Sequence, residues 1–134
     1  MTTEHVWPCL SCTDAHKTIA FLQDAFGFEP TEVVDGGDVR PVAHAELLTP
    51  WGGGVMLGSH VPGEEPFATR QPGAANVYVV VDDPDALFAR CTAAGAEVVR
   101  PLEDASGYES RGFTVRDPDG NLWAFGTYAG APRP

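Results

Sequence analysis

The first third of the chain passes from an extended apolar run to a helical pattern. Residues 6–12 form the stretch VWPCLSC, which is mostly apolar and typical of a strand. Apolar positions then recur at helical spacing between Asp14, a residue that can cap a helix, and Gly27, a residue that ends one. These apolar positions are Ile19, Leu22, Ala25 and Phe26. The pattern predicts a strand followed by a helix that buries one face.

The same order recurs half a chain later. Residues 76–81 form the strand pattern NVYVVV, and Asp83 and Pro84 stand where the cap and the first position of a helix belong. The apolar stripe of this helix consists of Leu87, Phe88, Cys91 and Ala94, and Gly95 follows it. Strand-like runs follow each helix, at 31–35, 42–49, 54–59, 97–102, 112–116 and 122–128. The chain therefore predicts an α+β fold of two βαβββ modules in tandem.

The repeat divides the chain into two modules and a linker. We expect a single domain over residues 1–134, because a chain of this length can bury a core without disulfides or metals. The first module covers about 5–60, the linker about 61–74, and the second module about 75–128.

A tight turn connects the last two strands of the second module. Residues 117–120 are DPDG, with Pro at the second position and Gly at the fourth, as a type I turn favours. A calcium loop counted from Asp117 would need Gly at its sixth position and Glu at its twelfth, and the chain has neither. We therefore expect the turn to be structural.

These motifs resemble the vicinal oxygen chelate superfamily, which includes glyoxalase I, extradiol dioxygenases, fosfomycin-modifying enzymes and bleomycin-resistance proteins. The resemblance rests on the segments AFGFE, DDPDAL, AAGAEV and RDPDGNLWAFGTY, and it extends over about residues 5–128. It implies that the two modules form a U-shaped mixed-sheet groove, often completed by a second subunit, and hence a homodimer. It implies no single activity, because the superfamily mixes metalloenzymes with metal-free binding proteins.

The resemblance also marks three positions where the metalloenzymes hold their metal. Two of them lie seven residues before the helix caps and carry Trp7 and Asn76 in this chain. The third lies four residues past Gly120 and carries Ala124. None of these side chains supplies the imidazole or carboxylate that such a divalent metal needs. We therefore expect no metal and no other cofactor, and we assign no catalytic residue.

His44 and Glu46 support a different interpretation. They stand two positions apart on one predicted strand, so their side chains share a face. By its spacing to Trp51, Glu46 matches a carboxylate that some glyoxalase I enzymes use as an additional ligand. The pair would hold a metal weakly or serve as acid and base; alternatively, both residues line a polar groove or face solvent. The second alternative is favoured, because a metal site normally takes three protein ligands or more.

Strand alternation indicates which other side chains line the groove. If positions 7 and 76 face it, then Cys9 and Tyr78 do so as well. By the same rule Trp123 and Phe125, which flank Ala124, are expected to face the helices.

Aromatic side chains dominate the predicted groove. Trp7, Asn76 and Tyr78 would form an aromatic wall with one amide, and Trp51 and Phe67 would close over it from loops. Such walls suit a flat or cationic organic molecule. The complete set of expected ligand-binding residues is Trp7, Cys9, His44, Glu46, Trp51, Asn76, Tyr78 and Ala124.

The cysteines indicate a reducing environment. Their number is odd, and Cys9 and Cys12, although spaced as C-x-x-C, should face opposite sides of a strand. Cys91 lies on the apolar stripe of the second helix and is expected in the core. The first residues do not resemble a signal peptide and no apolar run has spanning length, so we expect a cytoplasmic protein.

The chain is strongly acidic, and its negative charge limits the classes of partner that we expect. Its 8 Lys and Arg against 19 Asp and Glu give a net charge of −11, which argues against nucleic acid and anionic membranes as partners. The acidity either solvates the surface or attracts a cationic ligand. We predict a metal-free small-molecule binding protein of the bleomycin-resistance-like branch that sequesters an aromatic or cationic drug or natural product. The alternative is a glyoxalase-like metalloenzyme (a lyase, isomerase or dioxygenase) with a non-standard site at His44 and Glu46.

Overall fold

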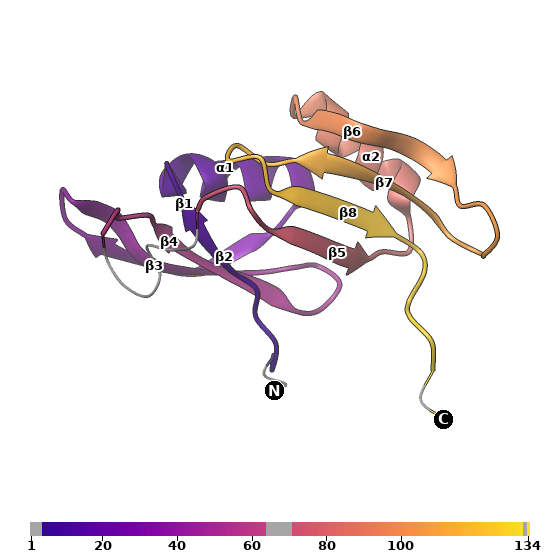
Figure 1. Ribbon diagram of the computed structural model, residues 1–134, viewed down its shortest axis with the longest axis horizontal. Helices are drawn as coiled ribbons and strands as arrows, with labels where there is room; N and C mark the ends of the chain where they lie inside the picture. The colour runs from indigo at the N-terminus through magenta and orange to yellow at the C-terminus, as the bar shows by residue number, and fades with distance from the viewer. Residues whose placement is uncertain (1–3, 64–70, 133) are drawn as a thin grey trace.

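The chain repeats one order of strands and helix twice (Figure 1). The computed structural model describes residues 4–63, 71–132 and 134. The first half contains β1 (Cys9–Cys12), α1 (Ala15–Phe26), β2 (Glu29–Gly36), β3 (Arg40–Leu48) and β4 (Gly54–Ser59). The second half contains β5 (Asn76–Val80), α2 (Pro84–Ala93), β6 (Glu97–Asp104), β7 (Arg111–Arg116) and β8 (Leu122–Gly126). The predicted α+β fold of two βαβββ modules is confirmed.

Each half forms its own four-stranded mixed sheet. The strand order is β1-β4-β3-β2 in the first sheet and β5-β8-β7-β6 in the second. In both sheets the first strand pairs in parallel with the last strand of its half, while the other pairs are antiparallel. The strands β1 and β5 therefore stand at an edge of their sheets, and the candidate site lies beside β5.

Local signals set the ends of both helices. The side chain of Asp14 caps α1, and Gly27 follows the helix in the left-handed region at φ 73°. Pro84 is the first residue of α2 after the cap Asp83, and Gly95 adopts φ 82° just past its end. The predicted caps are therefore confirmed. In the described part of the chain, no helix has the length and apolar character needed to cross a membrane.

One arginine joins the two helices. The guanidinium of Arg90 on α2 donates to the carbonyl oxygens of Asp24 (2.9 Å) and Gln23 (3.0 Å) at the end of α1. The Gln23 carbonyl also accepts the N–H of Gly27 at 3.0 Å. The carbonyls at the end of a helix generally lack partners within it, so the arginine supplies further donors there and balances the negative end of the helix dipole. The buried Cys91 thiol adds a contact of 3.4 Å to the Ala25 carbonyl. The two halves are thus tied together through their helices.

The two halves share one hydrophobic core. Trp123 and Phe125 of β8 are almost fully buried, as predicted from their alternation with Ala124. The ring of Phe26 on α1 reaches both of them, with ring centroids 5.3 and 4.7 Å apart. Phe28 lies 5.7 Å from Trp123. A helix of the first half therefore packs against a strand of the second, and neither half buries its apolar face alone.

The predicted turn at 117–120 forms, with a hydrogen bond of 2.9 Å across it. The buried carboxylate of Asp117 accepts the N–H groups of Asp119 and Asn121, both at 3.0 Å. Its other oxygen accepts the Asn121 amide (2.8 Å) and the Trp123 indole (3.0 Å). Asn121 in turn accepts the N–H of Ala75, just before β5, at 2.9 Å. The turn therefore anchors the start of β5 to β8.

Candidate functional site

A crevice of about 260 Å³ is lined by residues from both halves. The N-terminal segment and the β3–β4 loop form one side, and the edge strand β5 forms the other. Buried Phe28, Val55 and Trp123 lie at its bottom. The other lining residues are Val6, Pro8, Thr49, Trp51, Gly52, Gly53, Gly54, Val77, Tyr78, Val79 and Val80. Since few of these side chains are polar, the crevice suits a largely apolar ligand.

Trp51 forms one wall of the crevice from the β3–β4 loop. The Thr49 hydroxyl shapes this loop by accepting the Trp51 N–H at 3.1 Å and donating to the Gly52 carbonyl at 2.7 Å. The indole lies edge-on to Phe28 and Phe125, with centroids 6.3 and 6.2 Å away, and remains 38% exposed. Trp51 thus covers the core and presents a free ring surface to the crevice.

Phe67, the other residue predicted to cover the groove, lies outside the residues that the structure describes. Its position relative to the crevice therefore stays a prediction.

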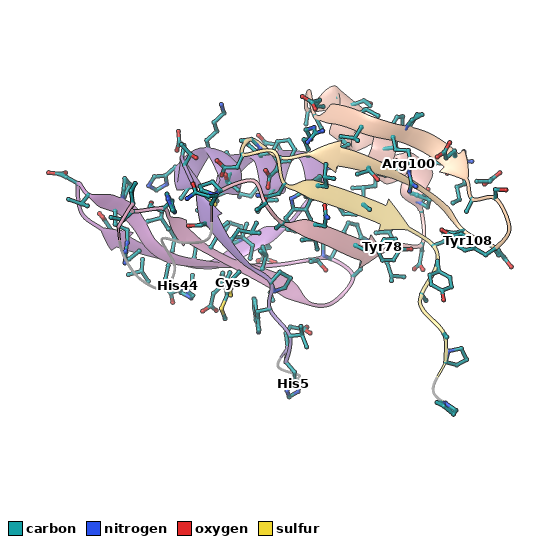
Figure 2. All side chains as sticks on the ribbon, viewed as in Figure 1. His5, Cys9, His44, Tyr78, Arg100 and Tyr108 are labelled. Carbon is teal, nitrogen blue, oxygen red and sulfur yellow. The ribbon has the colours of Figure 1, made fainter. Side chains whose placement is uncertain are left out.

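Tyr78 forms the opposite wall, on β5 (Figure 2). It pairs with Ala124 on β8, and its side chain is half exposed. The ring leans over Gly126, where a Cβ atom would lie 2.7 Å from the tyrosine oxygen. The hydroxyl donates to the Tyr128 carbonyl at 2.7 Å. Asn76 is exposed at the start of β5 but does not line the crevice.

Trp7 lies just before β1, which begins at Cys9. Its indole packs on Gly54, where a Cβ atom would lie 2.5 Å from a ring carbon, and its N–H donates to the Glu4 carbonyl at 3.2 Å. Its neighbours on either side line the crevice, whereas Trp7 does not, because successive side chains of an extended segment point in opposite directions. Of the predicted wall of Trp7, Asn76 and Tyr78, the crevice contains only the tyrosine.

The two cysteines of the C-x-x-C motif face opposite sides of β1, as predicted. Cys9 is exposed and Cys12 is buried, and both are free thiols. Burial raises the pKa of Cys12 to about 12, and it raises the pKa of Cys91 to about 12 as well. Both buried residues are therefore protonated thiols with low reactivity at neutral pH. Cys9 is the accessible thiol of this strand, 3.6 Å from the Trp7 carbonyl.

His44 and Glu46 form a pair on β3, also as predicted. The Nε2 atom of the histidine lies 2.8 Å from Oε2 of the glutamate, and both side chains are partly exposed. They share the face turned away from the core, because the alternating Ala45 and Leu47 are buried. Glu32 on β2 stands directly opposite Glu46. This arrangement can exchange a proton with a bound molecule or pair with a cation.

The donor set does not fit a metal centre of the kind that the family's enzymes contain. Among the described residues, no group of three His, Cys, Asp or Glu side chains is placed to hold a metal ion. His44 and Glu46 supply two donors, whereas Trp7, Asn76 and Ala124 supply neither imidazole nor carboxylate.

The structure also joins Ser11 and His60, which the sequence patterns did not connect. The serine hydroxyl on β1 lies 3.1 Å from Nδ1 of the histidine just past β4. The parallel pairing of β1 with β4 brings these residues together. No local spacing rule links positions so far apart, so only the sheet register could have revealed the pair.

Comparison with known proteins agrees with this architecture. The uncharacterized protein Rv0887c of Mycobacterium tuberculosis is 36% identical over 124 residues, which cover 89% of this chain and 71% of that protein. The crystal structure of TioX from Micromonospora sp. ML1 matches with a TM-score of 0.75 and 33% identity, covering 92% of this chain and 98% of TioX.

A second structure supports the fold alone. FosX, a fosfomycin resistance protein of Listeria monocytogenes in complex with Mn(II) and sulfate, matches with a TM-score of 0.66 and 20% identity, covering 98% of this chain and 93% of that one. The model of the Glyoxalase/Bleomycin resistance protein/Dioxygenase superfamily matches residues 4–125. The chain therefore belongs to the glyoxalase/bleomycin resistance protein/dioxygenase superfamily.

Proposed function

We propose that this protein binds a flat aromatic or cationic small molecule without a metal, in the manner of the bleomycin-resistance-like branch of its superfamily. The observation that carries the proposal is the crevice, because aromatic rings form its bottom and both of its walls. These rings are Phe28, Trp51, Tyr78 and Trp123. Ring faces of this kind stack on planar molecules and attract organic cations.

The remaining expected ligand-binding residues surround this crevice in the proposal. Trp7, Cys9, Asn76 and Ala124 would extend the contact surface beyond the mouth of the crevice. His44 and Glu46 would contribute polar contacts from β3. The net charge of −11 supports a cationic ligand over an anionic one, because the field of the whole chain attracts positive charge.

A second candidate function rests on the pair His44 and Glu46. Their separation of 2.8 Å on an accessible face suits proton transfer, so a superfamily enzyme with a displaced site remains the alternative. Elemental analysis after dialysis without chelator separates the two candidates. About one zinc, nickel, iron or manganese per chain, lost in Glu46→Gln, would support the enzyme and contradict metal-free binding.

Calorimetric titration with planar natural products, such as bleomycin-like compounds, quinones and polycyclic dyes, tests the binding proposal. Removing a stacked ring costs about 0.5–1.5 kcal/mol beyond the lost burial, so Tyr78→Ala should weaken binding about ten-fold. The matched control Tyr78→Phe keeps the ring and should stay within about three-fold of wild type.

Trp7→Ala, measured in the same titration, tests whether the ligand extends beyond the crevice. A ligand that stacks on Trp7 should bind this variant about ten-fold more weakly. Thermal melts must show that each variant is folded. Failure of every compound to bind, or equal binding by wild type and Tyr78→Ala, would refute the crevice as the ligand site.

A further inference from the structure

The three tyrosines of the chain lie together at one end of the second sheet. The Tyr78 hydroxyl donates to the Tyr128 carbonyl at 2.7 Å, and the rings of Tyr108 and Tyr128 meet edge to face with centroids 5.6 Å apart. Figure 2 labels Tyr78 and Tyr108 at this end of the molecule. The exposed fractions are 50% for Tyr78, 59% for Tyr108 and 43% for Tyr128. Aromatic surface is thus concentrated and open to solvent here.

A cavity of about 270 Å³ adjoins this tyrosine cluster. It lies at the β6–β7 connection, and its lining includes Tyr108, Asp104, Glu109, Arg111 and Thr127. The cavity is near the lower end of the sizes found for ligand pockets, so it suits a small ligand. Its lining combines one open ring with two carboxylates and a single cationic side chain.

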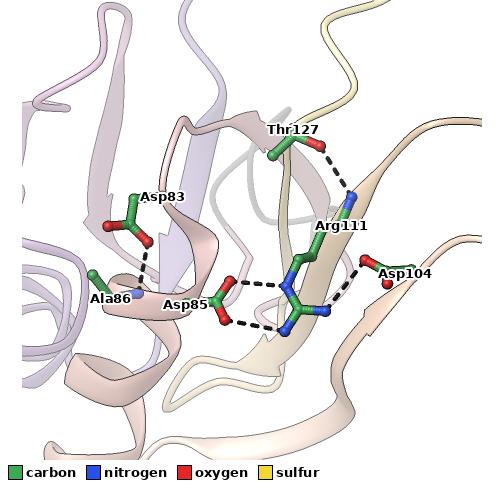
Figure 3. Close-up of polar contacts among 6 residues, drawn as sticks. All are labelled: Asp83, Asp85, Ala86, Asp104, Arg111 and Thr127. Atoms are coloured by element: carbon green, nitrogen blue, oxygen red, sulfur yellow. Dashed lines mark hydrogen bonds and ion pairs between the residues drawn. The ribbon is translucent and has the colours of Figure 1, made fainter.

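The cationic side chain is already neutralised by carboxylates (Figure 3). The Arg111 guanidinium makes two hydrogen bonds to Asp85, at 2.9 and 3.0 Å, and one to Asp104 at 3.2 Å. These bonds raise the pKa of Arg111 above its ordinary value, so its charge is permanent. Its backbone N–H donates to the Thr127 hydroxyl at 3.0 Å, which fixes the strand below the cavity. One positive charge therefore faces two bound carboxylates.

Glu109 leaves the cavity with an excess of negative charge. Within the described residues this carboxylate makes no ion pair or hydrogen bond. The cavity therefore presents a free carboxylate close to exposed ring surface. An anion would be repelled, and a neutral apolar molecule would gain nothing from the charge. A cation with an apolar surface would interact with both features.

We propose that the tyrosine cluster and its adjoining cavity form a second binding site, specific for a small organic ammonium ion. The methyl or methylene groups of such a cation would lie against Tyr108 and Tyr128, with Glu109 providing charge complementarity. Quaternary ammonium groups are recognised by aromatic side chains in this way. Tyr78 links this site to the crevice, since its ring lines the crevice and its hydroxyl holds the backbone of Tyr128.

Choline and 3,3-dimethylbutan-1-ol test the proposal, because the two molecules share a shape and differ in charge. Ligand-observed NMR follows the trimethyl proton signal, which moves upfield when the group lies over an aromatic face. We expect a saturable upfield shift with choline and binding at least about five-fold weaker for the neutral alcohol. No saturable shift with choline, or equal binding of both molecules, would overturn the proposal.

Variants of the exposed Tyr108 locate the site without changing the net charge. Tyr108→Leu should weaken choline binding at least about five-fold, whereas Tyr108→Phe, which keeps the ring, should stay within about two-fold. Trp7→Ala should also stay within about two-fold, because Trp7 does not contribute to this site. Unchanged choline binding by a folded Tyr108→Leu variant would refute the assignment. Tyr108 lines this cavity but not the crevice, so a loss of choline binding in Tyr108→Leu is distinguishable from binding of a cation in the crevice.

Discussion

The buried carboxylate of Asp117 offers a sharp test of how the site is held together. It accepts four hydrogen bonds between 2.8 and 3.0 Å long, from the backbone N–H groups of Asp119 and Asn121 and from the side chains of Asn121 and Trp123. Asn121 then holds Ala75 at the start of β5, the strand that carries the crevice residue Tyr78. Asp117→Ala would leave these donors without their acceptor.

The expected cost follows from these bonds. A hydrogen bond to a charged group contributes about 1.5–3 kcal/mol, and an unsatisfied buried donor costs about 1–3 kcal/mol. The terms are not additive, and water can enter the space left by the side chain. We therefore expect Asp117→Ala to lower the free energy of unfolding by about 3–5 kcal/mol, a large part of a total of about 5–15 kcal/mol. Asp117→Asn keeps one acceptor oxygen but turns an NH₂ group toward two donors, so about 2–3 kcal/mol should be lost.

Urea unfolding followed by far-ultraviolet circular dichroism measures these differences without relying on the Trp123 signal. Asp119→Ala is the matched control and should cost less than about 1 kcal/mol, since among the described residues the Asp119 carboxylate bonds only to the exposed Thr13 N–H, at 3.2 Å. A free energy of unfolding of Asp117→Ala within about 1 kcal/mol of wild type, or an equally destabilised control, would contradict this role of the Asp117 carboxylate.

Three further predictions concern the helices and the assembly. Arg90→Ala should cost about 1–2 kcal/mol in urea unfolding, because it removes two hydrogen bonds to the Asp24 and Gln23 carbonyls and the positive charge at the end of α1; no change would contradict this role. The bonds from Arg111 hold the pKa of Asp85 below its ordinary value, so this pair stabilises the fold above that value and the stabilisation is lost as pH falls through the lowered pKa. Thermal melts at several acidic pH values should therefore show that the melting temperature of Asp85→Asn depends less on pH than that of wild type. Identical pH profiles would count against a stabilising Asp85–Arg111 pair. Light scattering at micromolar concentration should give about twice the chain mass of 14.2 kDa if the protein is the homodimer implied by its family, and a monomer would exclude that proposal.

Patterns within the sequence predicted the elements and the direction of many side chains. The caps Asp14 and Asp83 and the glycine at position 27 act within a few residues, so their effect is visible in the chain itself. Strand alternation is equally local, and it placed Trp123 in the core and His44 beside Glu46 on one face. For the same reason the opposite orientations of Cys9 and Cys12 were predictable.

Only the tertiary structure decided which of these side chains meet. The crevice joins residues near the N-terminus to β5, and the tyrosine cluster unites positions from three separate segments of the second half. The hydrogen bond from Arg90 to Gln23 likewise connects residues 67 positions apart in sequence, and the Ser11–His60 pair connects residues 49 positions apart. Such contacts depend on the register between strands and on how the helix of one half packs against the sheet of the other. Both the register and this packing are set by the burial of the shared core. Strand alternation predicts the face of a sheet on which a side chain lies. The distance between side chains on different strands or helices is set only when the chain folds and packs.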